Sequence, residues 1–256
     1  MTFGIIAAGE GSRLWKEGVT TPKPLVGLGG EPLIDRLLRI FNGYNPARIA
    51  VICNDLHKET ASHIRNQMAV NVELARRVQL IVKTTPSSMH SFYELSPYLS
   101  EADVFCVSTV DTIFSETAFA SYLKHLQTCV ADGYDGCMGV TDYIDDESPL
   151  YVETDNQMNI VNFLDKPSSL TPLHTSPEGA SPHPSRYVSA GIYGLTPKAI
   201  DVLTDCIKRG EQRMRNYQRA LLRAGLRLKA FPMGKVMDVD HLGDIAKAEK
   251  FLSDEK

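Results

Sequence analysis

The stretch that decides the fold is Phe3-Gly-Ile-Ile-Ala-Ala-Gly-Glu-Gly-Ser-Arg13-Leu14, close to the N-terminus. Its first five residues form a short apolar run, which is typical of a strand buried in a sheet. The run leads into a loop with Gly9 and Gly11, and glycines let a backbone approach a phosphate and point its N–H groups at it. Arg13 adds a planar cation that suits phosphate oxygens. The stretch therefore predicts a buried strand that ends in a phosphate-binding loop.

The loop matches neither of the two common glycine-rich phosphate motifs. A Walker A loop ends in Gly-Lys-Ser or Gly-Lys-Thr, whereas the corresponding residues here are Gly11, Ser12 and Arg13. A dinucleotide-binding loop needs a third glycine, and Leu14 stands at that position. A dinucleotide-dependent oxidoreductase is therefore disfavoured, and binding of NAD(P)H would be the observation in its favour.

A second cationic position follows ten residues later. Lys23 lies between Pro22 and Pro24, and prolines restrict the backbone on both sides of it. The lysine is thus held in place. Together with the glycine loop and Arg13, it predicts a polyphosphate site.

The composition limits the class of protein. The 256 residues include 27 basic and 31 acidic side chains, a formal net charge of −4, and 43% of them are hydrophobic. This fits one ordinary globular domain, and the acidic balance argues against general binding to nucleic acid. No apolar run approaches the ~18 residues of a membrane span, and the N-terminus lacks the basic segment of a signal peptide. We expect a cytoplasmic protein without nucleic-acid or membrane partners.

The cysteines predict free, buried thiols. Their number is odd, and no Cys-x-x-Cys pair occurs. No Cys or His pair shows a spacing typical of a structural zinc site, so we expect none. The five are Cys53, Cys106, Cys129, Cys137 and Cys206.

Strands alternate with helices up to about residue 145, which implies parallel pairing in a layered α/β sheet. The expected strands are 3–7, 48–53, 78–82, 103–109 and 136–141. The expected helices are 32–41, 57–68, 89–99 and 117–130.

The pattern changes after residue 145. A hairpin (150–154 and 158–164) is followed by a proline-rich stretch over 167–185, which we interpret as a surface loop inserted in the domain, with a lid or a partner-binding segment as alternatives. The remaining elements are expected as strands at 186–195, 227–231 and 236–239 and helices at 197–208, 211–224 and 242–252.

The opening motifs resemble those of the nucleotidyltransferase superfamily, whose pattern is an apolar strand, A-A-G-x-G-x-R-L and then P-K-P-L. The matching residues are Ala7, Ala8, Gly9, Gly11, Arg13, Leu14, Pro22, Lys23, Pro24 and Leu25. The resemblance implies a three-layer, Rossmann-like α/β fold with a mostly parallel mixed central sheet. It also implies a single nucleotidyltransferase domain over 1–256, with a nucleotide-binding part (1–145) and an acceptor-binding part (146–256).

Aspartates are the candidate ligands for Mg²⁺. Asp111 follows an apolar strand, and ligands of open α/β sheets bind at that end of the strands. Asp238 and Asp240 alternate along a strand end and so point the same way. Their segment resembles the family's D-x-D-x-x-x-D pattern, which implies that one of them joins Asp111 on the metal. Asp244 is expected to interact with the start of the last helix.

Two further segments resemble the acceptor side of the family. Asp165 and Lys166 correspond to its E-K-P element, which implies that Lys166 meets the acceptor phosphate and that Asp165 meets the hydroxyl-bearing part. Gly191 lies in a segment similar to N-A-G-I-Y and would let the substrate lie against the backbone.

Ser87 and Ser88 lie where the family's loop for the nucleobase is expected, and capping of the next helix is their alternative role. We do not expect His90 to be a catalytic base, because a phosphate oxygen attacks without losing a proton. A row of arginines on the late helix is expected to form a solvated face, with contact to an anionic substrate as a lesser option. The row comprises Arg213, Arg215, Arg219 and Arg223.

We therefore expect a Mg²⁺-dependent enzyme that joins an NTP and a phosphomonoester, most simply a sugar 1-phosphate, and releases pyrophosphate. One alternative is a cytidylyltransferase for phosphocholine or another small alcohol phosphate, and another is a regulatory protein that binds nucleotides without turnover. A choline-type acceptor would need an aromatic cage around its cation. The candidates for such a cage are Trp15, Tyr143, Tyr151 and Tyr187.

Overall fold

The computed structural model describes residues 1–167 and 187–255. All but the first residue of the proline-rich loop expected over 167–185 thus lies outside the described residues. Within them, no helix is both long enough and apolar enough to cross a membrane.

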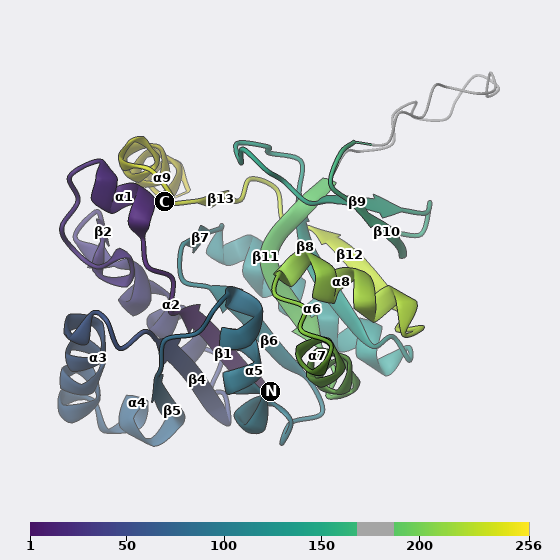
Figure 1. Ribbon diagram of the computed structural model, residues 1–256, viewed down its shortest axis with the longest axis horizontal. Coiled ribbons are helices and arrows are strands. Elements are labelled where there is room, and N and C mark those ends of the chain that lie inside the picture. The colour runs from purple at the N-terminus through teal and green to yellow at the C-terminus, as the bar shows by residue number, and fades with distance from the viewer. Residues whose placement is uncertain (168–186, 256) are drawn as a thin grey trace.

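A nine-stranded sheet forms the centre of the molecule (Figure 1). Its strands are β1 (Thr2–Ala7), β4 (Arg48–Cys53), β5 (Val78–Val82), β6 (Phe105–Thr109), β8 (Gly136–Thr141), β9 (Tyr151–Thr154), β10 (Ile160–Leu164), β11 (Tyr187–Leu195) and β12 (Leu228–Pro232). The main order is β10-β9-β11-β6-β1-β4-β5, and β8 pairs with both β11 and β12. The pairs among β6, β1, β4 and β5 and the pair β8–β12 are parallel, whereas β11 is antiparallel to its neighbours. The predicted mostly parallel, mixed sheet is confirmed.

Helices cover both faces of this sheet. The long ones are α2 (Leu33–Asn42), α3 (Lys58–Val70), α5 (Ser88–Leu99), α6 (Glu116–Ala131), α7 (Lys198–Lys208), α8 (Met214–Arg223) and α9 (Leu242–Asp254). Side chains of α2, α3 and α6 join one hydrophobic cluster, and those of α5, α7 and α8 join a second. Two cores separated by one sheet make the predicted three-layer architecture.

The strand at the centre explains why the cores form on both sides. Phe3 and Ile5 of β1 belong to one cluster and Ile6 to the other, because side chains alternate across a strand. The ring of Phe3 stacks on that of Phe41 of α2 with the centroids 4.4 Å apart. Complete burial of one such side chain contributes roughly 1.5–3 kcal/mol.

Several short elements depart from the predicted outline. They are α1 (Ser12–Lys16), the 3₁₀ turn η1 (Lys23–Leu25), β2 (Gly27–Leu28), β3 (Glu31–Pro32), α4 (Val72–Arg77), β7 (Thr112–Ile113) and β13 (Met237–Asp238). The loop after β1 is short, because α1 begins directly after Gly11. The expected strand 236–239 contains only the two residues of β13, which pair with β7. This pairing brings the late aspartate segment beside Asp111.

Candidate active site

A cavity of about 540 Å³ lies at the carboxyl ends of β1 and β6. We call it the loop pocket, and its lining combines residues from the start of the chain with one from its end. The lining residues are Ile6, Ala8, Gly9, Glu10, Gly11, Ser12, Arg13, Lys23, Pro24, Thr85, Pro86, Ser87, Ser88, Ser91, Thr109, Val110, Asp111 and Asp240. Most of the predicted nucleotide-site residues therefore meet here. Ala7 does not, because it is 1% exposed and packs in the core.

The two glycines of the loop differ in the space around them. A Cβ at Gly9 would have no heavy atom within 4 Å, although the residue lines the loop pocket. Gly11 has a φ of +64°, and its Cβ would lie 3.0 Å from the Cβ of Lys23. Gly11 is therefore required by the local fold, whereas Gly9 leaves space within the cavity itself.

A four-membered ion network lies along one wall of the loop pocket. The Nζ of Lys23 donates to Oδ1 of Asp240 at 2.6 Å and also pairs with Asp111. Nη1 of Arg13 donates to the other oxygen of Asp240 at 2.7 Å. Burial alone would lower the pKa of Lys23, but the charges of Asp111 and Asp240 outweigh it and raise the pKa above its ordinary value. The lysine, only 9% exposed, is therefore fixed and charged.

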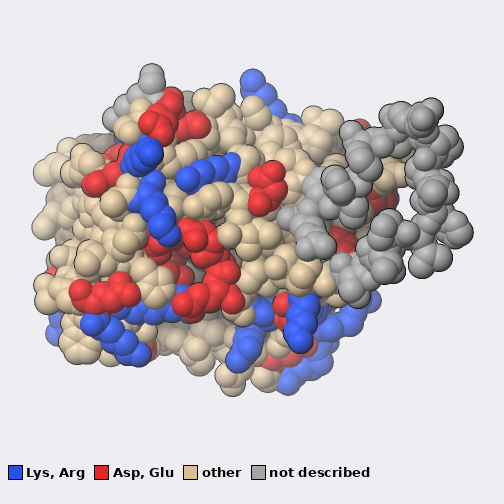
Figure 2. All heavy atoms as spheres, turned by 90° about the horizontal axis from the view of Figure 1, so that it is seen from above, with Lys and Arg blue, Asp and Glu red and all other residues tan. Residues whose placement is uncertain are grey.

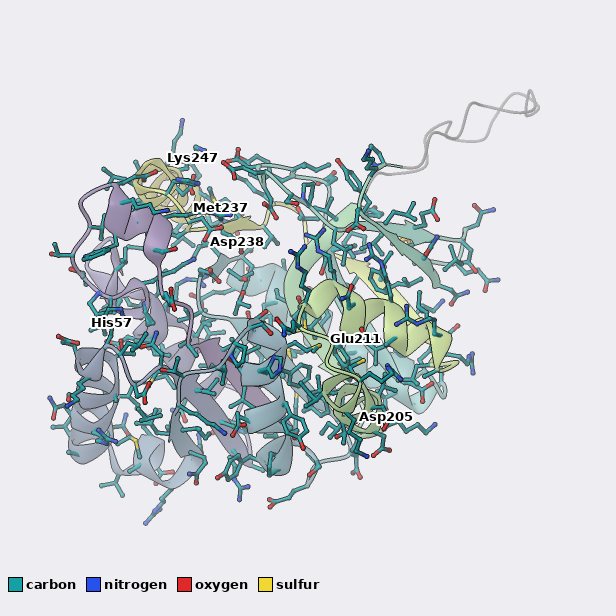
Figure 3. All side chains as sticks on the ribbon, in the orientation of Figure 1. His57, Asp205, Glu211, Met237, Asp238 and Lys247 are labelled. Carbon is teal, nitrogen blue, oxygen red and sulfur yellow. The ribbon has the colours of Figure 1, made fainter. Side chains whose placement is uncertain are left out.

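Asp238 is an exposed residue of β13, in the segment that leads into α9 (Figure 3). Its Oδ1 accepts a hydrogen bond of 3.2 Å from the hydroxyl of Thr112. The surrounding protein and the charges of Asp111 and Asp240 raise the pKa of Asp238 above its usual range. Carboxylates brought this close repel one another, and a hard cation bound by their oxygens would relieve the repulsion.

The donors thus suit Mg²⁺, but they are not equivalent. Asp240 is held by Arg13 and Lys23, whereas Asp238 is bonded only to Thr112 among the described side chains. Asp244 has the predicted helix role: its Oδ2 accepts from the backbone N–H of His241 at 2.8 Å, at the start of α9.

Charge is distributed unevenly on this side of the molecule. Figure 2 shows acidic side chains near the middle of the face seen from above in Figure 1, with basic side chains on either side of them. A neighbouring cavity of about 340 Å³ beside the start of α9 contributes to this acidic region. Its acidic lining residues are Asp145, Asp146, Glu147, Asp238, Asp240 and Asp244.

A third cavity, of about 420 Å³, lies against the start of α8, and we call it the α8 pocket. Its lining residues are Ser87, Ser88, Thr109, Asp146, Ser148, Leu150, Ser189, Gly191, Tyr193, Gln212, Arg213, Met214, Arg215, Gln218 and Asp238. Ser87, Ser88 and Thr109 line the loop pocket as well, so the two cavities adjoin. Sequence analysis missed Gln218, although it lies on the same helical face as the apolar Met214 and Leu221, where a polar residue is unusual.

Gly191 lines the α8 pocket, but its conformation also has a packing reason. Its φ is +70°, and a Cβ there would lie 2.8 Å from Oγ1 of Thr112. The glycine therefore lets β11 approach β7, in addition to the predicted contact with substrate.

The expected acceptor pair lies at the end of β10. Asp165 is exposed and accepts hydrogen bonds from Nη1 of Arg215 at 2.6 Å and Nη2 of Arg219 at 2.9 Å. Lys166 is exposed and lines none of the three cavities. The solvated face predicted for the late helix is wrong for Arg215 and Arg219, which are about three-quarters buried and bind β10.

Ser87 has the capping role that was its alternative. Its hydroxyl accepts from the backbone N–H of His90 at the start of α5. Ser87 Oγ also lies 3.0 Å from Nδ1 of His90. The imidazole is thus engaged with the cap. Because both serines line the two adjoining cavities, a contact with substrate remains open to them.

The four aromatic residues considered for a cation cage do not meet. Trp15 is 70% exposed and lines none of the three cavities, and Tyr151 and Tyr187 line none of them either. Tyr143 lines the cavity beside α9, where Nζ of Lys235 lies 4.5 Å from the ring centroid.

All five cysteines are free and buried, as predicted. The expectation that no thiol has a metal-ligand spacing was wrong, because α6 places His125 and Cys129 one turn apart and Cys137 of β8 lies beside them. Their ligand atoms all lie within 4.8 Å of one another. None of the three residues lines the loop pocket or the α8 pocket.

Comparison with known families gives a match over nearly the whole chain. The family model described as nucleotidyl transferase matches residues 4–255. A curated relative, the bifunctional protein GlmU of Methanococcus maripaludis, is 21% identical over 253 residues. The match covers 97% of this chain and 54% of the relative, so the chain spans about half of that protein's length.

Solved structures share the fold along the whole chain. A putative glucose-1-phosphate thymidylyltransferase from Bacillus anthracis superimposes with a TM-score of 0.77 at 19% identity, covering 99% of this chain and 96% of the other. The inositol-1-phosphate CTP transferase from T. maritima has a TM-score of 0.74 at 18% identity, covering 100% and 96%. At such identities the likeness establishes the architecture.

Proposed function

Because the chain belongs to the nucleotidyl transferase family, we propose that it transfers a nucleoside monophosphate from an NTP to a phosphomonoester and releases pyrophosphate. In this proposal residues 1–145 bind the nucleotide, residues 146–256 bind the acceptor, and together they form one domain. The loop pocket would take the triphosphate and the α8 pocket the acceptor.

One observation carries the proposal: the two cavities share a wall. Ser87, Ser88 and Thr109 line both, so ligands in the two cavities would lie side by side. The loop pocket offers Gly9, with open space above its Cα, and a buried cation, Lys23. Two adjacent sites, of which one suits a polyphosphate, are what a transfer between two phosphates requires.

The proposed reaction is a displacement at phosphorus. An oxygen of the acceptor phosphate attacks the α-phosphorus of the NTP and forms a new P–O bond. The bond from that phosphorus to the oxygen bridging to the β-phosphate breaks, and its electron pair leaves with pyrophosphate. No proton has to be removed from the attacking oxygen, so the step needs no general base. Positioning and charge stabilisation therefore supply the catalysis.

The side chains have separate tasks in this scheme. Lys23 and Arg13 would bind the triphosphate and stabilise the charge that develops on pyrophosphate. Ser87 and Ser88 would contact the nucleobase. Lys166 is exposed and lines neither cavity, so the scheme gives it no contact with the reacting phosphate.

We assign a Mg²⁺ ion to Asp111 and Asp238, because Asp240 is held by two cations, Arg13 and Lys23, whereas Asp111 pairs with Lys23 alone and Asp238 accepts only from Thr112 among the described side chains. When bound, such an ion neutralises phosphate charge. Asp240 would instead pair with the two cations while the triphosphate is absent.

A sugar 1-phosphate is the acceptor class that we favour. Phosphocholine fits less well, because the candidate cage residues do not converge in the described part of the chain and because Arg213 and Arg215 line the α8 pocket. A quaternary ammonium would be repelled by the guanidinium groups and would meet one aromatic residue of the lining, Tyr193, in place of a cage. A nucleotide-binding protein without turnover remains the alternative of another class.

The experiment is an assay of pyrophosphate release with Mg²⁺, in which each of the four NTPs is combined with a panel of phosphorylated acceptors. Release that requires both substrates would support the transferase. NTP binding without release in any combination would favour the non-catalytic alternative.

A further inference from the structure

The α8 pocket contains a buried polar atom that has no partner within the described residues. Gln218 is only 3% exposed, and its Oε1 accepts no hydrogen bond there. Buried amide oxygens are nearly always satisfied in folded proteins. Gln218 lines the α8 pocket, and rotation of its side-chain amide would turn this oxygen toward a hydrogen-bond donor on a bound ligand.

The same wall carries a guanidinium group that has no carboxylate partner among the described residues. Asp165 is shared between Arg215 and Arg219, with contacts of 2.6 and 2.9 Å. Arg213, at the N-terminal boundary of α8, forms no ion pair with any described side chain, although it lines the pocket. Asp146, which is exposed, and Asp238 are the acids that line the pocket. Of the two guanidinium groups in the lining, Arg215 is already paired with Asp165, and Arg213 has no such partner among the described residues.

These residues lie away from the wall where the two substrates would meet. Arg213, Arg215 and Gln218 line only the α8 pocket, whereas Ser87, Ser88 and Thr109 line both cavities. If the proposed function holds, the reacting phosphate lies near the shared wall, beside the NTP. The arginines then face a different part of the acceptor.

We propose that the acceptor carries a second anionic group, distinct from its reacting phosphate, which Arg213 binds with support from Arg215. Oε1 of Gln218 would accept a hydrogen bond from a hydroxyl or N–H group of the same molecule. A guanidinium fork suits both a carboxylate and a phosphate. The substrate class is therefore an acidic sugar phosphate or a sugar bisphosphate, in place of a neutral hexose phosphate.

Three acceptors with one common ring test the inference: glucose 1-phosphate, glucuronic acid 1-phosphate and glucose 1,6-bisphosphate. At constant ionic strength, we expect one of the doubly anionic compounds to exceed glucose 1-phosphate in kcat/KM by about 10–100-fold, the range of one charge-assisted hydrogen-bond pair. Preference for the uronic acid would identify a carboxylate, and preference for the bisphosphate would identify a phosphate.

Arg213→Gln is the decisive variant, and Arg223→Gln is its matched control. Arg223 lies on the same helix but is exposed, lies 3.8 Å from Glu211 and lines none of the three cavities. Arg213→Gln should lower kcat/KM for the preferred doubly anionic acceptor by about 10–100-fold more than for glucose 1-phosphate, so that the preference is lost. Arg223→Gln should leave all three values unchanged. An equal loss on all three acceptors in Arg213→Gln would show that Arg213 binds the reacting phosphate, which overturns the inference and leaves the transferase standing.

Gln218→Met separates a ligand contact from a structural role. The substitution keeps most of the volume and removes the unpaired oxygen, so thermal stability should be unchanged or higher. We expect kcat/KM for the preferred acceptor to fall by about 5–20-fold. A lower melting temperature with unchanged kinetics would show that Gln218 is structural.

Calorimetric binding of the three acceptors without NTP distinguishes failure of this inference from failure of the transferase. Tighter binding of a doubly anionic compound, lost in Arg213→Gln, would support the subsite even if no pyrophosphate is released. Equal affinities for all three would overturn it, whatever the turnover assay shows.

Discussion

Gly9 and Gly11 lie two residues apart in one loop, but only Gly9 has room for a side chain. We expect Gly9→Ala to keep the free energy of unfolding within about 0.5 kcal/mol, because the added methyl meets no protein atom. The same methyl would enter the loop pocket, and misplacement of the triphosphate should lower kcat/KM by about 10–100-fold.

Gly11→Ala is the matched comparison. Its φ of +64° and the 3.0 Å approach to Lys23 should cost about 1–2 kcal/mol of stability. Denaturant unfolding and pyrophosphate release measure the two effects. Full activity in Gly9→Ala would mean that the triphosphate does not bind against this part of the loop pocket.

Lys23 is the residue on which the chemistry depends most. Lys23→Met keeps the length of the side chain and removes its charge, so turnover should fall by about 10²–10³-fold. Lys16→Met in α1 is the control, because Lys16 is exposed and lines none of the three cavities. Circular dichroism should show both variants folded. Unimpaired turnover in Lys23→Met would contradict the assignment.

Local motifs predicted much of this site, whereas residues that depend on tertiary packing were missed. The glycine loop and the Pro-Lys-Pro segment can each be recognised from a few consecutive residues. Gln218 has no such local signal, because only the fold shows that it lines a cavity. The row of arginines on the late helix was predicted to be solvated, because their spacing suggests one charged face. No local signal shows that Asp165 pairs with Arg215 and Arg219 of this row.

At the scale of elements, Asp135 ties together three segments on the far edge of the sheet. It precedes β8, and its carboxylate accepts from Nζ of Lys198 of α7 at 2.8 Å and from the backbone N–H of Arg227, before β12, at 2.9 Å. Burial alone would raise the pKa of Asp135, but these hydrogen bonds outweigh it and lower the pKa below its ordinary value.

Asp135→Asn should therefore destabilise the protein by about 1–2 kcal/mol at neutral pH, a figure limited by the exposure of Lys198. A lowered pKa favours the charged form in the folded state, so the difference from wild type is present above about pH 4 and shrinks as the pH falls below it. Asp205→Asn, at an exposed site on α7 (Figure 3), is the control with little expected effect. Urea unfolding between pH 3 and 8 measures both, and a pH-independent difference would argue against an ionic contribution.

The long elements follow from periodicity, whereas the short ones have no local signal. β4, β5 and β8 begin and end at the predicted residues. β4 and β8 are buried on both faces, and such strands are continuous runs with few polar residues. α1 has five residues and β13 only two, too few for a period to show. The pairing of β13 with β7 joins segments more than a hundred residues apart, which no single stretch of sequence reveals.

At the scale of the whole molecule, the active-site assignment depends on the meeting of the two ends of the chain. Near the start of the chain, α1 supplies Arg13 and η1 supplies Lys23, and the segment before the last helix supplies Asp238 and Asp240. The family resemblance predicted that both segments contribute, but only the fold shows which groups each of the two aspartates contacts. Asp240 contacts the cations, and Asp238 contacts β7.

The ion pairs of Asp240 make this carboxylate an internal competitor of the triphosphate. An incoming polyanion has to displace it from Arg13 and Lys23 before it can use either cation. Asp240→Asn should therefore tighten binding of an NTP in EDTA by about 3–10-fold, since one negative charge leaves the pocket. Fluorescence titration measures this affinity, and weaker binding in Asp240→Asn would mean that the carboxylate positions the cations more than it competes for them. Selectivity follows from the same competition: a monophosphate, with fewer charges to offer, should displace Asp240 far less readily than a triphosphate does.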